Sequence, residues 1–175
     1  MAHHPLTQSQ ITDRCRKLRL ISFDVDGVLT DGKLYYSDDG REIKAFNVQD
    51  GAALKLLQQQ GVAVAILTGR DSPMVARRAA ELGIEHLFQG LDDKRVGLKR
   101  LLEQTGLTVE QTAHVGDDLQ DLTLFDAVGL SISVPNGHPT VLSRADLVTT
   151  TSGGQGVASE LAELILRAQD NWPYD

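Results

Sequence analysis

Two aspartates separated by a single residue follow an apolar run near the start of the chain. The run Leu18–Phe23 leads into Asp24, Asp26 and Gly27. In an open α/β sheet, ligands bind outside the carboxyl ends of the strands, so both carboxylates should border such a crevice. A bend beginning at Gly27 would turn them towards one ligand. Carboxylates in such a place can hold a metal ion, attack an electrophile or move a proton.

These acids have two other interpretations. An Asx-type turn would use an aspartate only to start a loop, and the stretch alone leaves this interpretation open. An EF-hand calcium loop is excluded by spacing, because Val28 and Leu29 occupy the positions of its next oxygen ligand and its glycine.

A second polar group follows the apolar run at 62–67. Thr68, Gly69 and Arg70 offer a hydroxyl, a free N–H and a guanidinium, which are the group types that hold phosphate oxygens. The alternative is an ordinary junction between a strand and a helix. A Walker loop is excluded, since the pattern GxxxxGK[ST] does not occur in the sequence.

Two further groups of candidates lie later in the chain. Lys94 begins a predicted helix after a short strand, where a lysine could equally be a solvated surface residue. Asp117, Asp118 and Asp121 follow the apolar segment at 113–116, where acids could also simply complement a helix dipole. The order of all these groups favours one shared site, because each follows a different strand of one predicted sheet.

The composition is that of one globular domain. The chain has 175 residues, of which 41% are hydrophobic and 23% charged, and it can bury a core without disulfides. Its single cysteine, Cys15, favours a reducing, cytoplasmic setting. The net charge of −7 argues against a nucleic-acid partner. No apolar run reaches the roughly 20 residues that span a bilayer. The first ten residues also lack a signal-peptide pattern, so no membrane association is expected.

Short apolar runs alternate with amphipathic segments, which predicts an α/β fold with a doubly wound, Rossmann-like parallel sheet. Strands are expected at 18–25, 62–68, 86–88, 113–116, 128–134 and 146–148. Helices are expected at 49–60, 73–82, 93–104, 118–127 and 157–168. Segment 33–47 has two β-like arms around a turn, which predicts a projecting β-hairpin. No segment is large enough for a cap domain. We expect one domain over 1–175, with an N-terminal extension at 1–16, the hairpin as a flap, and a C-terminal helix and tail at 152–175.

Together, the polar groups resemble the four motifs of the haloacid dehalogenase (HAD) superfamily. The motifs appear here as DVDGVLTDG from Asp24, ILTGR ending at Arg70, Lys94, and GDDLQD from Gly116. The resemblance implies a Mg²⁺-dependent phosphatase. In such an enzyme Asp24 would attack phosphorus and form an aspartyl-phosphate. Asp26 would protonate the leaving group and then activate the hydrolytic water.

The resemblance also implies what the other motif residues do. Mg²⁺ would be held by the side chains of Asp24 and Asp117 and by the backbone carbonyl of Asp26. Thr68 and the N–H of Gly69 would hold phosphate oxygens. Lys94 would neutralise charge on the phosphate. Asp118 and Asp121 would not touch the substrate but would bind the metal's waters or orient Lys94.

Other segments resemble the capless HAD branch of 3-deoxy-D-manno-octulosonate 8-phosphate phosphatases. They are the hairpin and the stretches GIEHLFQGLDDK and TSGGQGVASELAELIL. That family implies hydrolysis of this sugar-acid phosphate for lipopolysaccharide synthesis in the cytoplasm. It also implies a homotetramer, in which the hairpins form a barrel and screen a neighbour's site. The substrate contacts that it implies are Asp26, Asn47, Val48, Gln49, Asp50, Gly51, Lys55, Thr68, Gly69, Arg70, Arg78 and Lys94.

Four positions depart from that family's pattern. Arginine is common in the family where this chain has Gln49 and Lys55, and arginines also stand where it has Gln155 and Ser159. These changes leave the phosphatase chemistry untouched but keep a related nine-carbon sugar-acid phosphate open as the substrate. An alternative of another class is a non-catalytic phosphate sensor or assembly module, against which the four intact motifs argue. None of the five histidines is given a part in the reaction: His3 and His4 are expected in a disordered terminus, and His86, His114 and His138 are expected to be structural.

Overall fold

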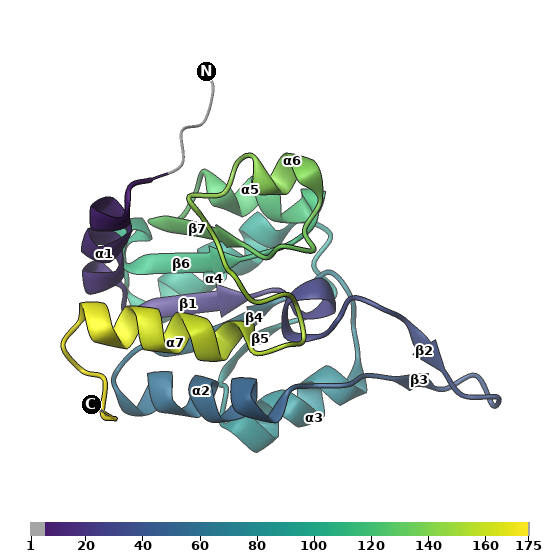
Figure 1. Ribbon diagram of the computed structural model, residues 1–175. Helices are drawn as coiled ribbons and strands as arrows, with labels where there is room; N and C mark the ends of the chain where they lie inside the picture. The colour runs from purple at the N-terminus through teal and green to yellow at the C-terminus, as the bar shows by residue number, and fades with distance from the viewer. Residues whose placement is uncertain (1–5, 175) are drawn as a thin grey trace.

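The computed structural model describes residues 6–174, and its centre is a six-stranded parallel sheet (Figure 1). The strand order is β5-β4-β1-β6-β7-β8. The strands are β1 Leu20–Phe23, β4 Ala63–Leu67, β5 His86–Phe88, β6 Thr112–Val115, β7 Leu130–Ser133 and β8 Leu147–Val148. Each overlaps a segment predicted as a strand, so the predicted parallel sheet is confirmed. Because β1 lies between β4 and β6, the groups that follow these three strands meet at one edge.

Helices cover both faces of this sheet. The largest apolar cluster lies on one face and includes residues of α1 Gln8–Lys17, α2 Val48–Gln59, α3 Pro73–Leu82 and α7 Val157–Ala168. Two smaller clusters involve α4 Lys94–Thr105 and α5 Leu122–Phe125. Alternate residues of β1 divide between the faces, since Ile21 and Phe23 belong to the first cluster and Leu20 to one of the others. This is the doubly wound arrangement that the sequence predicts.

Helix α3 has the predicted bounds but begins without a side-chain cap, and the helix predicted at 118–127 is divided. Ser72 occupies the N-cap position of α3, but its hydroxyl makes no capping bond; its N–H is bound by the side chain of Gln89 at 3.0 Å. The predicted helix at 118–127 is a 3₁₀ turn, Leu119–Asp121, followed by the short α5. The Asp121 side chain turns inwards at this turn. There it accepts bonds from the backbone N–H groups of Asp117 and Asp118, which a continuous helix would leave free.

The expected N-terminal extension holds a regular helix, α1. Thr7 and Gln10 form a reciprocal capping box at its start, a signal that the sequence carries. Ile11 and Cys15 are buried in the main core, and burial raises the pKa of the Cys15 thiol to about 11. The side chain of Gln169 donates to the backbone oxygens of Cys15 and Leu18 and ties the end of α1 to the segment after α7. His3 and His4 lie outside the described residues.

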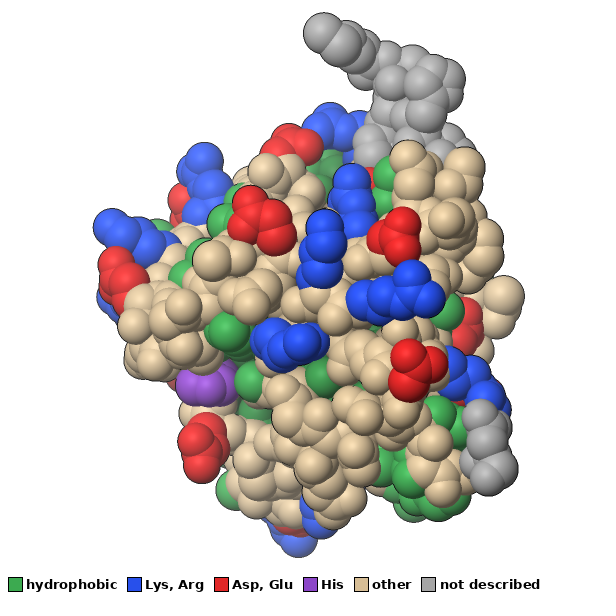
Figure 2. All heavy atoms as spheres, turned by 90° about the vertical axis from the view of Figure 1, so that its left-hand side faces the viewer, with side chains coloured by type: hydrophobic (Ala, Val, Ile, Leu, Met, Phe, Trp, Pro, Cys, Tyr) green, Lys and Arg blue, Asp and Glu red, His purple; other side chains and the backbone are tan. Residues whose placement is uncertain are grey.

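Lysine and arginine side chains gather on the face that carries α1, on the left of Figure 1 and towards the viewer in Figure 2. They include Arg14, Arg16 and Lys17 in the last turn of α1, where cations complement the helix dipole. The strands point away from this face, so these cations lie at the end of the sheet opposite the predicted site. No helix among residues 6–174 has the length and apolar character to cross a membrane.

The predicted hairpin projects from the body of the molecule (Figure 1). It pairs β2 Tyr35–Tyr36 with β3 Glu42–Ile43 in antiparallel register around a turn at Ser37–Gly40. Its exposed large apolar side chains are Leu34, Tyr35, Tyr36 and Ile43. Phe46, by contrast, is half-buried against the main core, so the exposed apolar surface ends before that residue.

Candidate active site

The chain turns sharply where β1 ends. The backbone N–H of Asp24 is bound by the Val115 oxygen of β6 at 2.9 Å, which fixes the residue beside the neighbouring strand. Gly27 has φ +94°, a left-handed conformation that favours glycine, and a Cβ there would overlap the carboxylate of Asp117. The predicted bend at Gly27 is therefore present, and it lets two loops approach each other closely.

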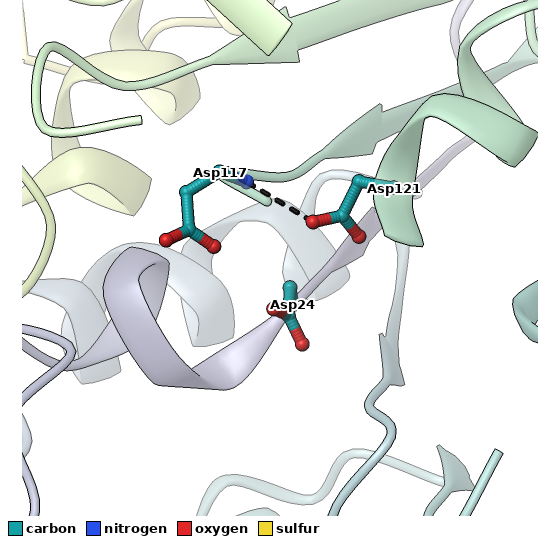
Figure 3. Close-up of side chains that lie close together, drawn as sticks. All are labelled: Asp24, Asp117 and Asp121. Carbon is teal, nitrogen blue, oxygen red and sulfur yellow. Dashed lines mark hydrogen bonds between the residues drawn. The ribbon is translucent and has the colours of Figure 1, made fainter. Parts of the chain in front are cut away.

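Three carboxylates meet at this edge of the sheet. Asp24, Asp117 and Asp121 each place an oxygen within 4.8 Å of the others (Figure 3). Burial, reinforced by the neighbouring carboxylates, raises the pKa of Asp24 to about 6 and that of Asp117 to about 7. One oxygen of Asp117, Oδ1, is buried without a hydrogen-bond partner. A buried, unpartnered carboxylate oxygen in such a cluster fits a hard divalent cation, and these residues are suitable ligands for Mg²⁺.

Lys94 balances part of this negative charge. Its Nζ lies 3.0 Å from Asp24 Oδ1 and 2.5 Å from Asp121 Oδ1. The side chain is only 3% exposed. Burial by itself lowers the pKa of Lys94, but the two carboxylates outweigh it and raise that pKa above its usual value, so the ammonium is retained. Lys94 is thus a fixed cation between two acids, and the surface interpretation of this lysine is wrong.

Asp121 anchors the cluster from behind. Its Oδ1 also lies 2.9 Å from His114 Nε2, and His114 Nδ1 lies 2.9 Å from the hydroxyl of Ser22 on β1. Burial opposes ionisation of Asp121, but the bonds from His114 and Lys94 outweigh it and lower the pKa of this carboxyl. Burial is also the main cause that lowers the pKa of His114, which favours the neutral ring. The side chain of Asp118 instead caps the adjacent turn by accepting from the Leu119 N–H at 2.7 Å.

A cavity of about 430 Å³ opens in front of these residues. It brings together every residue that the four motifs contribute to the predicted site. Its lining consists of Asp24, Asp26, Gly32, Thr68, Gly69, Arg70, Leu91, Asp92, Lys94, Asp117, Asp118, Gln120 and Asp121. The cavity places the carboxylate of Asp24 and the cations Lys94 and Arg70 around one space that an anion can enter.

One residue of the hairpin, Lys44, reaches Asp26, and a second, Glu42, lies beside Lys44; sequence reasoning missed both. Lys44 forms a short ion pair with Asp26 Oδ1, and its Nζ also lies 3.4 Å from Glu42 Oε1. Arg70 pairs with the same glutamate oxygen at 2.9 Å and lies 3.8 Å from Asp26 Oδ2. Alternation along a strand puts positions 42 and 44 on one face of the hairpin arm. The sequence therefore indicates that Glu42 and Lys44 share a face, but it does not indicate which residues that face contacts.

Several predicted substrate contacts lie away from this cavity in the single chain. Asn47 caps α2 by accepting from Gln49 N–H at 2.7 Å, and Asp50 is buried, accepting the Ala158 N–H at the start of α7 at 2.8 Å. Val48 is exposed.

The remaining predicted contacts lie on α2 and α3. Lys55 is exposed on α2. Gly51 allows the Arg78 guanidinium to approach α2, and Arg78 donates to the Asn47 oxygen at 3.4 Å. Substrate binding by Lys55, Gly51 and Arg78 stays a prediction, as it does for Asn47, Val48, Gln49 and Asp50.

The fold and the carboxylate cluster are those of a HAD-type hydrolase, and a family model for haloacid dehalogenase-like hydrolases matches residues 87–161. The chain is 42% identical over 161 residues to 3-deoxy-D-manno-octulosonate 8-phosphate phosphatase KdsC of Escherichia coli K12, covering 92% of this chain and 86% of that protein. It therefore belongs to the 3-deoxy-D-manno-octulosonate 8-phosphate phosphatase family and is an enzyme, a phosphoric monoester hydrolase.

Solved structures of phosphatases from the same family are similar to this chain in both sequence and fold. The Moraxella catarrhalis phosphatase, in complex with magnesium, phosphate and KDO, is 45% identical, with a TM-score of 0.91 over 94% of this chain and 95% of that one. The cobalt-bound Haemophilus influenzae phosphatase is 43% identical, with a TM-score of 0.86 over 90% and 92% of the two chains.

Proposed function

We propose that this enzyme hydrolyses 3-deoxy-D-manno-octulosonate 8-phosphate to the free sugar acid and phosphate, with Mg²⁺ as its cofactor. The observation that carries the proposal is the buried Lys94, held between Asp24 and Asp121 at the back of an acid-lined cavity. Family membership supports the substrate, since the relatives named above carry that activity in their names.

Asp24 is the nucleophile in this proposal. Its carboxylate attacks phosphorus, the bond to the sugar oxygen breaks, and an aspartyl-phosphate forms. Lys94 holds Asp24 Oδ1 at 3.0 Å, which restrains the attacking group and offsets charge on the phosphoryl oxygens. Thr68 and the N–H of Gly69, both on the cavity wall, bind those oxygens.

Asp26 moves the protons. It protonates the departing sugar oxygen and then takes a proton from the water that hydrolyses the aspartyl-phosphate. Asp24, Asp117 and the backbone carbonyl of Asp26 would hold Mg²⁺, which offsets the negative charge of nucleophile and substrate when bound. Asp121 keeps Lys94 in place, and Asp118 shapes the loop that carries Asp117.

We further infer a single domain, a cytoplasmic location, a role in lipopolysaccharide precursor synthesis, and a homotetramer. The tetramer is supported by the exposed apolar side chains of the hairpin. A hairpin packed against a neighbouring subunit would also explain how predicted contacts outside the cavity, such as Lys55, could approach a substrate.

The substrate is tested by comparing kcat/KM for the eight-carbon sugar-acid phosphate, a nine-carbon sugar-acid phosphate and glucose 6-phosphate. The eight-carbon compound should exceed glucose 6-phosphate by about 100-fold or more, the scale of two to three kcal/mol of specific contacts. Equal values for all three would refute the substrate but not the phosphatase activity. A preference for the nine-carbon compound would point to the related sugar-acid phosphatase.

Arg78 offers a sharper version of this test. Arg78→Ala should raise KM for the sugar acid much more than for p-nitrophenyl phosphate, because a guanidinium binds a carboxylate in a bidentate fashion. Arg77→Ala is the matched control, since Arg77 is 82% exposed and pairs with Glu81. Equal effects of the two substitutions would remove Arg78 from the substrate site.

A further inference from the structure

A lysine on the projecting hairpin lies buried beside the proposed acid and base. Lys44 stands just beyond β3, yet its side chain is only 3% exposed. By comparison, Lys33 at the other end of the hairpin is 74% exposed. Burying an ammonium is unfavourable unless charged partners compensate for the lost water. The position of Lys44 therefore depends on its partners, Asp26 and Glu42.

These partners belong to a closed ring of four charges. Asp26 pairs with Lys44, Lys44 with Glu42, Glu42 with Arg70, and Arg70 lies 3.8 Å from the second oxygen of Asp26. The ring joins three segments: the turn after β1, the hairpin, and the turn after β4. Its formal charges cancel, so it can persist beside the acidic cluster around Asp24.

We propose that Lys44 is a positioning residue, which holds the Asp26 carboxyl group where its protonated form can transfer a proton to the leaving oxygen; this rests on the proposed function of Asp26. A general acid must lie within about 2.6–3.2 Å of the atom that it protonates. An aspartate on a turn can rotate about its side-chain bonds. Lys44 binds Oδ1 from the hairpin side, while Glu42 holds the ammonium in place.

The consequence concerns the leaving group. A sugar alkoxide is a poor leaving group and needs a proton as the ester bond breaks, whereas p-nitrophenolate leaves without one. A residue that only orients the acid should therefore matter for the first step, the release of the leaving group, with the sugar phosphate and little with p-nitrophenyl phosphate. The second step, in which Asp26 acts as base on water, is common to both substrates, so the comparison is made on the first step. A residue that binds phosphate or stabilises the whole site should affect both substrates equally.

The test compares Lys44→Met with Lys33→Met on both substrates, using the full-length enzyme with Mg²⁺. Lys44→Met should lower the rate of leaving-group release in a single turnover of the sugar phosphate by about tenfold or more, part of the 10²–10⁴ that general acid–base catalysis supplies. KM for that substrate and the rate of p-nitrophenolate release in a single turnover should change by less than about threefold. Lys33→Met should leave both rates unchanged, and Lys44→Arg should recover part of the loss.

Equal losses on both substrates, or a loss confined to KM, would overturn the proposal. If Lys44→Met does not fold, Glu42→Gln removes the second partner of the ammonium at nearly constant volume. Glu42→Gln should also slow the sugar phosphate more than p-nitrophenyl phosphate, by a smaller factor than Lys44→Met. An equal loss on both substrates would again overturn the proposal. The variant Asp26→Asn distinguishes a failure of the proposed role of Asp26 from a failure of the proposed role of Lys44. If Asp26→Asn slows both substrates equally, the role of Asp26 as the acid is wrong. If Asp26→Asn slows the sugar phosphate more than p-nitrophenyl phosphate but Lys44→Met does not, only the role of Lys44 is wrong.

Discussion

The buried cluster behind the cavity and the projecting hairpin are built in opposite ways. Asp121 alone receives bonds from His114, Lys94 and two backbone N–H groups. The hairpin has two strands of only two residues each, and its apolar side chains face outwards. An isolated hairpin of this kind is marginally stable. The side chains of Lys94, Asp121 and His114 are therefore fixed by the core, while the hairpin depends on what it contacts.

The largest expected effect comes from the cluster. Asp24→Asn should lower kcat by about 10⁴-fold or more, the scale seen when a covalent nucleophile is removed, because an amide cannot attack phosphorus. The substitution hardly changes the volume, so the thermal midpoint should stay close to that of the parent enzyme. Phosphate release and thermal unfolding, measured on the same preparation, check both expectations. A variant that kept a tenth of the parent activity would show that Asp24 is not the nucleophile.

Metal removal acts on the same region. Activity should vanish in EDTA and return with Mg²⁺, because two aspartate side chains and one backbone carbonyl suit an ion that keeps several waters. Ca²⁺ should support little turnover, since it prefers more oxygen ligands at longer distances. A steady-state assay over a range of free metal concentrations measures this. Full turnover in metal-free buffer would contradict the proposed cofactor.

A single methyl group can disturb the cluster without touching its polar residues. A Cβ at position 116 would overlap the carboxyl carbon of Asp121, so Gly116→Ala should displace that side chain from Lys94 and His114. Overpacking costs about 1–3 kcal/mol, and a shift of about 1 Å can lower kcat up to 100-fold. Chemical denaturation and kcat are the measurements.

Gly106→Ala is the control for this substitution. No atom lies within 4 Å of its added Cβ, and its φ of +68° predicts a backbone cost of about 1 kcal/mol without loss of kcat. Equal kcat for the two variants would show that Asp121 does not position the site.

The smallest effect on stability is expected in the hairpin. Tyr36→Lys and Ile43→Lys place charges on side chains that are 61% and 53% exposed. They should dissociate the proposed tetramer while changing the free energy of unfolding of the isolated subunit by less than about 0.5 kcal/mol. Light scattering reports the mass, and Val109→Lys, at another exposed apolar side chain, is the control. A parent enzyme that is monomeric at micromolar concentration would contradict the tetramer.

The sequence predicts the cluster better than the hairpin for a physical reason. The positions of Asp24, Thr68 and Asp117 follow from β1, β4 and β6 being adjacent and parallel, since their carboxyl ends then share one edge. Lys44 could not be placed in this way, because a hairpin has no fixed direction relative to the sheet. Its contact with Asp26 is a tertiary one between residues 18 positions apart.

Two buried polar residues show the same limit. Asp50 was predicted to bind substrate, but in the single chain it accepts a bond from a residue 108 positions away at the start of α7. His114 was predicted to be structural, and it is buried; its bond to Asp121, however, ties it to the cluster. For His114, on β6, a strand covered on both faces gives no sequence signal for which face a polar side chain will meet. For Asp50, on α2, the partner comes from a helix far along the chain, which local sequence does not indicate.

The buried Cys15 has a practical consequence for observing the hairpin. It is the one cysteine of the sequence, and its raised pKa leaves almost no thiolate at neutral pH. A maleimide dye should therefore ignore the parent enzyme and label a new cysteine at the exposed turn residue Asp38. In the proposed tetramer, energy transfer between such labels on different subunits would then report how closely two hairpins approach, with every other native residue left in place.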